Sequence, residues 1–435
     1  MKIIIAMGCL ALLAAGTTGA ATRADSLMKV DSRDLVSRAD LSYDTPVVRS
    51  EEGIPIGNGR MGSLVWTTPA ALHFQINHVD LFCMGHSTLS FLKGHPDYSS
   101  GCGYVDNNGV DYGDNVFAGR DFHQHLSVYD GLATVAGKGI NSRVLAWSDG
   151  DVIATELDDQ RKKSDAVHVD LRMLRYAVNY VEKHNFLLSS NHAAQVRTGF
   201  HIATSKLDIR AGRILLIQEF REGDFYSASA VAVGIAGRKS RADYYNETTV
   251  RLSAEPGRGT LTILTASAVS YDPKQDVAGL ALKQLSTAQA KSFDGLLQDN
   301  QRWWNGYWAR GFIHLHSADG VADEVEKNYT CFLYIMASCS RGEYMPRFCG
   351  MLWGTDGALR MWGSQYWRNN QGTYFNGLTP ANRPELMAPM FTTYTRLLNP
   401  FRVPRASSGA VRVFGFLKPL GSIDWKTFPT MSPQK

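Results

Sequence analysis

The hydrophobic periodicity of this chain changes once, near residue 275, and that change limits the folds it can adopt. Before it, apolar and polar residues alternate in short runs such as 72–77, 167–171 and 260–263, with turn-like clusters of Gly, Asn and Asp between them. Alternation with a period of two is typical of strands that bury one face. Many short strands with no long helix between them predict one large antiparallel β-sandwich over residues 27–275.

After this point the apolar residues recur at helical spacing. Residues 276–312 read as a helical linker whose aromatic end packs on a neighbour, and a short strand is expected at 312–315. Two further helices are predicted at 321–340 and 384–398, the first ending before Arg341-Gly342. The linker pattern rests on seven side chains: Leu282, Leu285, Phe293, Leu296, Leu297, Trp304 and Trp308.

Length and charge narrow the class of protein. A chain of 435 residues exceeds one ordinary core, so two or more domains are expected. A formal net charge of +4 is too small to indicate nucleic acid or a membrane surface as a partner. Nine Trp and 18 Tyr suit either large cores or sites that stack on sugars, and composition alone leaves both open.

The first 20 residues read as a secretory signal peptide. Lys2 supplies the positive start, residues 3–15 form an apolar run, and Thr18-Gly19-Ala20 offers a small-residue cleavage site. The run is too short to remain as a stable membrane anchor, and Cys9 lies too early to favour a lipoprotein signal. We therefore expect a periplasmic or extracellular protein.

No metal or cofactor is expected. Five cysteines remain after signal cleavage, an odd number without zinc-site spacing, and most should be small buried residues. A Gly-rich loop offers oxygen ligands for Ca²⁺, but its spacing is not that of an EF-hand, and a polar turn is favoured. His123 and His125 share a strand face, where ordinary polar contacts are favoured over a metal. The cysteines and loop residues are Cys83, Cys102, Cys331, Cys339 and Cys349, with Asp106, Asn108, Asp111 and Asp114.

A first motif, PIGNGRMG, occupies residues 55–62. Three glycines around one Asn predict a tight turn with positive φ before a strand. Arg60 within it could line a site or pair with a carboxylate. The motif resembles the P-x-G-N-G-R-x-G block that opens the β-sandwich of glycoside hydrolase family 95, the α-L-fucosidases and their relatives.

A second motif, GMLWGTDGALRMWGSQYWRNNQ, occupies residues 350–371. It is similar to the family stretch G-x-W…W-G-S-x-Y-x-x-N-x-N, found early in an (α/α)6 barrel. The resemblance implies a β-sandwich, a helical linker and, over residues 313–400, the start of an incomplete (α/α)6 barrel. It also implies that two Asn side chains lie in the sugar site and that one holds the attacking water. Asn369 matches the first Asn, and Gln371 stands at the second; these are the catalytic candidates.

The residue types of this second motif suit a carbohydrate substrate. Trp353, Trp362 and Trp367 can offer flat apolar faces, while Asp356 and Asn370 can offer hydrogen-bond partners. These five are the substrate-binding candidates. The alternative interpretation is a Trp-rich segment that packs into a core.

The resemblance stops near residue 399. Over residues 407–423, codons read two bases later permit the family's continuing pattern, in order. We therefore expect residues 401–435 to be a frameshifted tail. The resemblance places the catalytic Glu acid, and the Asp that supports the water, beyond that point. As written, the chain is then expected to lack its catalytic acid and to be inactive, and residues 313–400 are expected to be loosely ordered.

Three functions follow from these patterns. The first is a truncated glycoside hydrolase whose intact relatives act by inverting hydrolysis, which requires an acid and a base. The second is a non-catalytic carbohydrate-binding β-sandwich fragment. The third is a structural sandwich without a ligand.

Overall fold

The computed structural model describes residues 31–47, 49–81, 101–108, 115–162, 165–174, 203–222, 225–348, 350–355 and 368–398. Several predicted features lie outside these residues: the signal peptide, the 401–435 tail, Cys83, Cys349, Asp111, Asp114, Asp356, Trp362 and Trp367.

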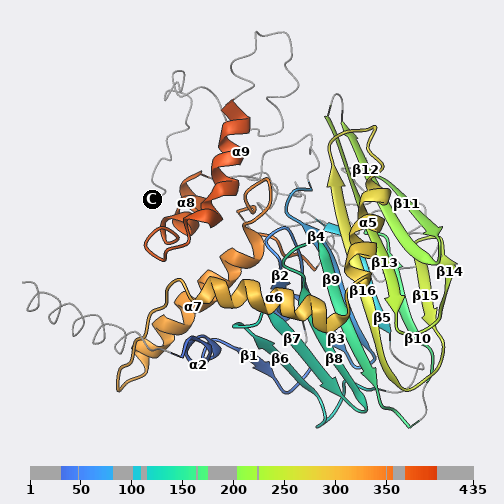
Figure 1. The fold of residues 1–435 in the computed structure, drawn as a ribbon, viewed down its shortest axis with the longest axis horizontal. Helices are drawn as coiled ribbons and strands as arrows, with labels where there is room; N and C mark the ends of the chain where they lie inside the picture. The colour runs from blue at the N-terminus through green and yellow to red at the C-terminus, as the bar shows by residue number, and fades with distance from the viewer. Residues whose placement is uncertain are drawn as a thin grey trace, which may run out of the picture.

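Two antiparallel sheets form the larger part of the described chain, as the alternating pattern predicts (Figure 1). In spatial order, the nine-stranded sheet contains β1 (Leu41–Tyr43), β6 (His123–Ser127), β7 (Leu132–Gly137), β8 (Ile140–Ala146), β9 (Val152–Asp159), β16 (Gly259–Ser270), β13 (Phe225–Ala236), β12 (Arg213–Glu222) and β11 (Ala203–Arg210). The seven-stranded sheet contains β14 (Ser240–Asn246), β15 (Thr249–Ala254), β10 (Val167–Arg172), β5 (Gly101–Asn108), β4 (Ala71–His78), β3 (Met61–Thr68) and β2 (Ile54–Gly57).

Strand β4 shows the alternation of side chains between the two faces of the sheet, and it also shows that the outer face is not always exposed. Leu72, Phe74 and Ile76 point into the main core between the sheets. Gln75 and Asn77, on the opposite face, are buried as well. The Asn77 side chain donates to the Gly354 carbonyl at 3.2 Å, because the segment 350–355 lies over this face. The outer face of the seven-stranded sheet is thus covered at its β2–β4 end.

The linker consists of two helices rather than one. Helix α5 (Val277–Gln289) ends before Lys291. Ser292 is the N-cap of α6 (Phe293–Trp308), and its hydroxyl accepts from the Gly295 amide at 3.2 Å. Because this N-cap satisfies an amide at the start of α6, it permits a change of direction that periodicity does not reveal. Helix α5 and the first turns of α6 pack on the outer face of the nine-stranded sheet, whereas the aromatic end of α6 (Trp304, Tyr307 and Trp308) joins the main core. The strand expected at 312–315 is not formed.

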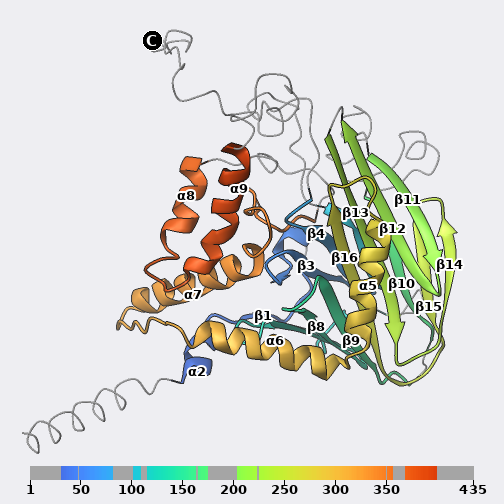
Figure 2. The same ribbon diagram turned by 45° about the horizontal axis from the view of Figure 1, so that its top comes forward.

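In the part of the chain that the structure describes, three helices follow the linker, and they stand beside the sandwich (Figure 2). Helix α7 (Val321–Cys339) packs on β2 and β3. Helix α8 (Arg368–Asn376) carries the second motif's amides, and the helix predicted at 384–398 is a 3-10 turn, η2 (Pro384–Met387), followed by α9 (Ala388–Leu398). Two short elements near the start are α2 (Ser32–Ser37) and η1 (Ser50–Glu52).

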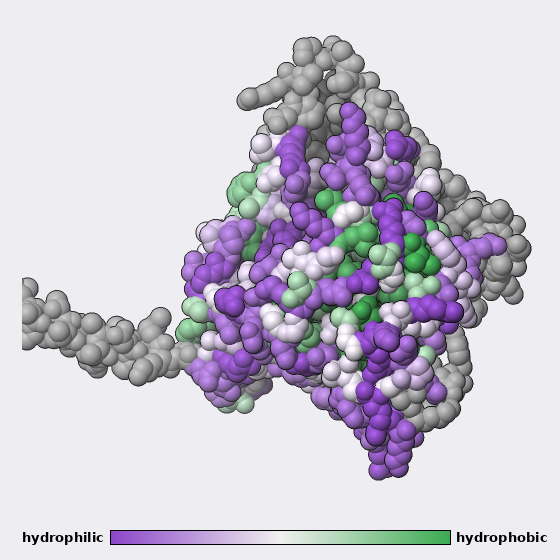
Figure 3. Space-filling view, turned by 45° about the vertical axis from the view of Figure 1, so that its right-hand side comes forward, coloured by the Kyte–Doolittle hydropathy of each residue, from purple (hydrophilic) through white to green (hydrophobic). Residues whose placement is uncertain are grey.

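One face of the molecule is mainly polar. Figure 3 shows this side, where hydrophilic residues predominate and hydrophobic residues gather near the centre. Among the described helices, none is long and apolar enough to cross a membrane.

Candidate functional site

The first motif forms a tight turn that fixes one corner of a cavity. The buried Asn58 side chain accepts the backbone amides of Arg60 and Met61 at 2.9 and 2.8 Å. It also donates to the Trp147 and Gly150 carbonyls in the β8–β9 turn at 3.1 and 2.8 Å. A buried amide with this many partners ties the two sheets together at one point.

Gly59 lies in the tight turn with positive φ that the first motif predicts. Its φ is +91°, and a Cβ added there would lie 2.3 Å from the Arg341 Cβ. The Gly59 amide donates to the Ser338 carbonyl at 2.8 Å, and the Arg341 amide donates to the Gly59 carbonyl at 2.9 Å. The turn therefore forms a close backbone contact with the end of α7, which only glycine permits.

Arg60 pairs with a carboxylate, one of the two interpretations of this residue, and it also lines the cavity. Its Nε lies 2.6 Å from the Asp151 Oδ1, and the same side chain lines the cavity. Asp151 also faces the His78 Nε2 at 3.4 Å and the Gln284 Nε2 at 3.3 Å. Burial alone raises an aspartate pKa, but His78 and Arg60 outweigh it and hold the pKa of Asp151 well below its usual range. Asp151 is therefore an anion held by surrounding donors.

His78 and Asp80 continue this network away from Arg60. The Asp80 amide donates to the His78 Nδ1 at 3.2 Å, which assigns the neutral ring's proton to Nε2, facing Asp151. An Asp80 carboxylate oxygen accepts the Tyr344 amide at 2.9 Å. Burial raises the pKa of Asp80, and the nearby His78 and backbone amides oppose that shift. Two buried carboxyl groups of one cavity thus have pKa values shifted in opposite directions.

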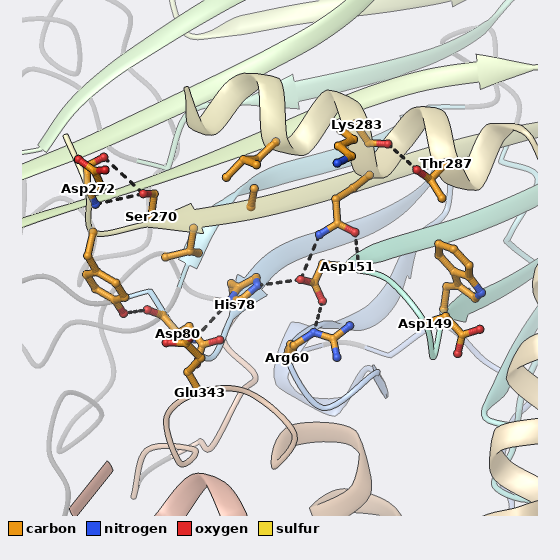
Figure 4. A pocket seen from close by; sticks show the side chains of 16 residues that line it. Arg60, His78, Asp80, Asp149, Asp151, Ser270, Asp272, Lys283, Thr287 and Glu343 are labelled. Atoms are coloured by element: carbon orange, nitrogen blue, oxygen red, sulfur yellow. Dashed lines mark hydrogen bonds and ion pairs between the residues drawn. The ribbon is translucent and has the colours of Figure 1, made fainter. Parts of the chain in front are cut away.

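The cavity has a volume of about 680 Å³ and lies where β4, the β8–β9 turn, the end of β16 and helix α5 meet. Figure 4 shows Asp151 between His78 and Arg60, with Lys283 and Thr287 on the α5 side. The half-buried Tyr271 and the exposed Glu343 also line it. A concave site with several polar groups and shifted pKa values is a candidate binding site.

Arg341 supports the cavity from behind the turn. Its guanidinium lies 4.0 Å from the centre of the Trp303 ring and donates to the Ser148 carbonyl at 3.2 Å. Burial, together with the positive charge of Arg60, lowers the pKa of Arg341 to about 10. The end of α7, helix α6 and the β8–β9 turn are held together by this one side chain.

The candidates of the second motif lie elsewhere. Trp353 is buried, 9% exposed, and its Nε1 donates to the Ile56 carbonyl at 2.9 Å, so it contacts the strand that carries the first motif. Gln371 is 1% exposed and donates to the Pro346 carbonyl at 2.6 Å. Asn370 is exposed on α8, and only the backbone of Asn369 is described there. Trp353, Asn370 and Gln371 do not line the cavity, and a sugar site formed by the second motif stays a prediction.

The histidine pair makes ordinary polar contacts. His123 pairs with Asp44 at 2.9 Å, and His125 with Asp40 at 3.2 Å. Across the described residues, no group of three potential metal ligands gathers. Asp106 and Asn108 lie in β5, where only the backbone is described. Cys102 and Cys339 are buried in apolar clusters, as expected for most of the cysteines.

Sequence reasoning missed His78, Asp80 and Asp151. The motif pointed to Arg60 and left its carboxylate partner unidentified. The nearest signal was Ser148-Asp149-Gly150, which reads only as a turn between strands. That turn belongs to the β8–β9 hairpin and presents Asp151 to Arg60.

No protein-family model matches the sequence, and no curated protein matches it. Solved structures do. The "Putative kojibiose phosphorylase from human microbiome" is 12% identical with a TM-score of 0.53, covering 83% of this chain and 49% of that one. A gh92 family glycosyl hydrolase is less similar in structure, with a TM-score of 0.43 and 14% identity, covering 83% and 49%. A family GH92 inverting mannosidase from Bacteroides thetaiotaomicron has a TM-score of 0.40 and 14% identity, covering 73% and 41%.

At this level of identity, the likeness to the phosphorylase concerns the fold alone. The chain spans about half the length of these matched structures. The resemblance to family 95 is not tested by them. The described residues form two antiparallel sheets followed by a few helices, an arrangement shared with the kojibiose phosphorylase structure.

Proposed function

We propose that this chain is the β-sandwich and first helices of a glycoside-hydrolase-like protein, and that the cavity beside Arg60 and Asp151 binds a carbohydrate. The observation that carries the proposal is the chemistry of that cavity. It combines fixed anions, two cationic side chains and a tyrosine ring in one concave site. Sugars need many directed hydrogen bonds together with apolar contact.

Two further features support the proposal. The fold is shared with the structure of the putative kojibiose phosphorylase. The two motifs that resemble family 95 also contact each other, through the Trp353 hydrogen bond to Ile56. The proposal includes the barrel start at 313–400 and secretion to the periplasm or exterior. The sugar-facing role that the family resemblance implies for the positions of Asn369 and Gln371 is a separate proposal, because Gln371 is buried and does not line this cavity.

Among the described residues, binding is supported better than hydrolysis. A general acid must release a proton to the leaving oxygen, and Asp151 is an anion already held by Arg60, His78 and Gln284. Burial raises the pKa of Asp80, but this carboxyl is 8% exposed and accepts the Tyr344 amide. Glu343 pairs with Arg396 at 2.7 Å. Carbohydrate binding without catalysis is therefore the alternative that the described residues favour over hydrolysis at this cavity.

Lys283 provides the test because it lines the cavity from α5, is exposed, and can be removed without disturbing a core. Tryptophan fluorescence and calorimetry would be followed during titration with neutral oligosaccharides of glucose, mannose, galactose and fucose. We expect at least one to bind, and Lys283→Ala to weaken its binding about tenfold, or ~1.4 kcal/mol.

The matched control is Lys206→Ala, which removes an exposed lysine from β11, away from the cavity. It should leave the affinity unchanged. If no saccharide in the set binds, or if Lys283→Ala binds as tightly as the wild type, the proposed site is wrong.

A further inference from the structure

A second hollow, of about 700 Å³, lies past the C-terminal end of α5. The Arg60 cavity is lined by α5 residues up to Thr287, whereas Gln289 is the α5 residue that lines this hollow. Its remaining wall is built from the β11–β12 turn, the β13–β14 turn and the β15–β16 turn. The two sites therefore share no residue.

The hollow has a fixed frame because the chain crosses twice between the sheets there. Strand β13 belongs to the nine-stranded sheet and β14 to the seven-stranded one, and the chain returns from β15 to β16. The Glu255 amide donates to the Lys239 carbonyl at 2.9 Å, which joins the two crossing segments. Opposite them, Ala211 and Gly212 both have positive φ in the tight β11–β12 turn.

Positive charge predominates in this hollow. It is lined by Arg213, Arg238, Lys239 and Arg241, against the single carboxylate of Glu255. Arg241 pairs with Asp243 at 2.8 Å. Within the described ranges, no carboxylate forms an ion pair with the other three basic side chains.

Two of these guanidinium groups are held in place by neutral oxygens. The Arg213 Nη2 donates to the Gln289 side-chain oxygen at 2.6 Å, and a Cβ added at Gly234 would lie 2.6 Å from the Arg213 Cδ. The Arg238 Nη2 donates to the Gly259 carbonyl at 3.0 Å, while its Nη1 is buried without a described partner. Neutral acceptors fix the groups and leave their charge uncompensated, which favours a bound anion.

The concave shape indicates which kind of anion. Proteins bind duplex nucleic acid with an extended basic surface, and the chain's net charge of +4 gives little support for such a surface. Three basic side chains without an ion pair among the described residues, set against one carboxylate, suit a compact anionic ligand with carboxylate or sulfate groups. We propose that the hollow at the β13–β14 and β15–β16 turns is a second binding site, for an acidic saccharide carrying carboxylate or sulfate groups; the anion follows from the basic lining, and the saccharide class rests on the function proposed above.

The test uses the full chain in affinity electrophoresis, with dextran sulfate or neutral dextran in the gel. Dextran sulfate should retard the wild-type protein, and neutral dextran should not. The double variant Arg213→Gln/Lys239→Ala should raise the apparent Kd for dextran sulfate at least fivefold. Because Arg213 also contacts Gln289, the single variant Lys239→Ala, at an exposed position, guards against misfolding and should raise the Kd at least twofold.

The control variant Lys206→Ala/Arg221→Ala removes the same two charges from exposed positions outside the hollow and should bind as the wild type does. Equal weakening in the control and the hollow variant would overturn the proposal, because general charge would then explain the binding. Equal retardation by a single-stranded oligonucleotide of matched charge would overturn the assignment to a saccharide. The hollow variants should retain any neutral-sugar binding at the Arg60 cavity, so the two proposals fail separately.

Discussion

The sandwich and the helices that follow it differ in how they bury apolar side chains. The sandwich fills the space between its two sheets with its own strands. Helix α7 instead buries Leu333, Tyr334 and Met336 in that same core. Residues 313–400 are expected to be loosely ordered, but in the described part of that range the sandwich supplies packing partners that a count of missing helices overlooks. Among the described side chains of α7 and α9, the large apolar ones that remain exposed are Val321, Val325 and Phe391.

This comparison implies that the stability of the helices after the linker depends on a few contacts with the sandwich. The contact with the largest expected effect is that of Tyr334, which is 3% exposed, stacks on Trp304 at 5.0 Å and donates to the Pro55 carbonyl at 2.9 Å. We expect Tyr334→Ala to lower the free energy of unfolding by about 3–5 kcal/mol, as for other large buried aromatics. Urea denaturation followed by Trp fluorescence would measure it.

Tyr244→Ala is the matched control, since Tyr244 is 60% exposed on β14. It should change the free energy of unfolding by less than about 0.5 kcal/mol. If the two variants were equally stable, α7 would not depend on the sandwich in the way its contacts indicate.

A smaller effect is expected at the turn that joins the two regions. Gly59 and Gly119 have nearly the same φ, +91° and +94°, but a Cβ at Gly59 would strike Arg341, whereas nothing lies within 4 Å of one at Gly119. Gly119→Ala should cost about 1 kcal/mol from backbone strain alone. Gly59→Ala should cost about 1–3 kcal/mol more, because the end of α7 must shift. Equal losses for both in thermal unfolding would show that the contact with α7 is not close in solution.

The pH dependence at the junction should be weaker still, and its sign follows from Asp151. A carboxyl whose pKa is lowered on folding stabilises the protein above its unfolded pKa, and that stability is lost as the pH falls toward the folded value. The unfolding free energy of the wild type should therefore fall between pH 5 and pH 2 more steeply than that of Asp151→Asn. Parallel curves would mean that Arg60 and His78 do not hold Asp151 as an anion.

The parts of this fold that could be predicted from the sequence are those that neighbouring residues determine. Leu72, Phe74 and Ile76 show their buried face by alternation, and Gly57-Asn58-Gly59 shows its turn by residue type. The burial of Asn77 could not be predicted, because it depends on Gly354, far along the chain.

The cavity was missed for the same reason. His78 and Asp151 are 73 positions apart, and only the packing of the β4 end beside the β8–β9 turn brings them to 3.4 Å. The break in the linker depends on one cap at Ser292. Long-range contacts and single hydrogen bonds of this kind leave no periodic signal in a sequence.

The central claim is that the sandwich carries both α7 and a sugar site at their junction. Amide hydrogen exchange on the full chain, with and without the saccharide found by titration, tests it most directly. The account predicts that the amides of α7 exchange as slowly as those of β3, and that the saccharide adds protection at residues 57–61 and 147–151. If α7 exchanged rapidly, or if protection appeared at 368–371 and not around Arg60 and Asp151, the account would be contradicted.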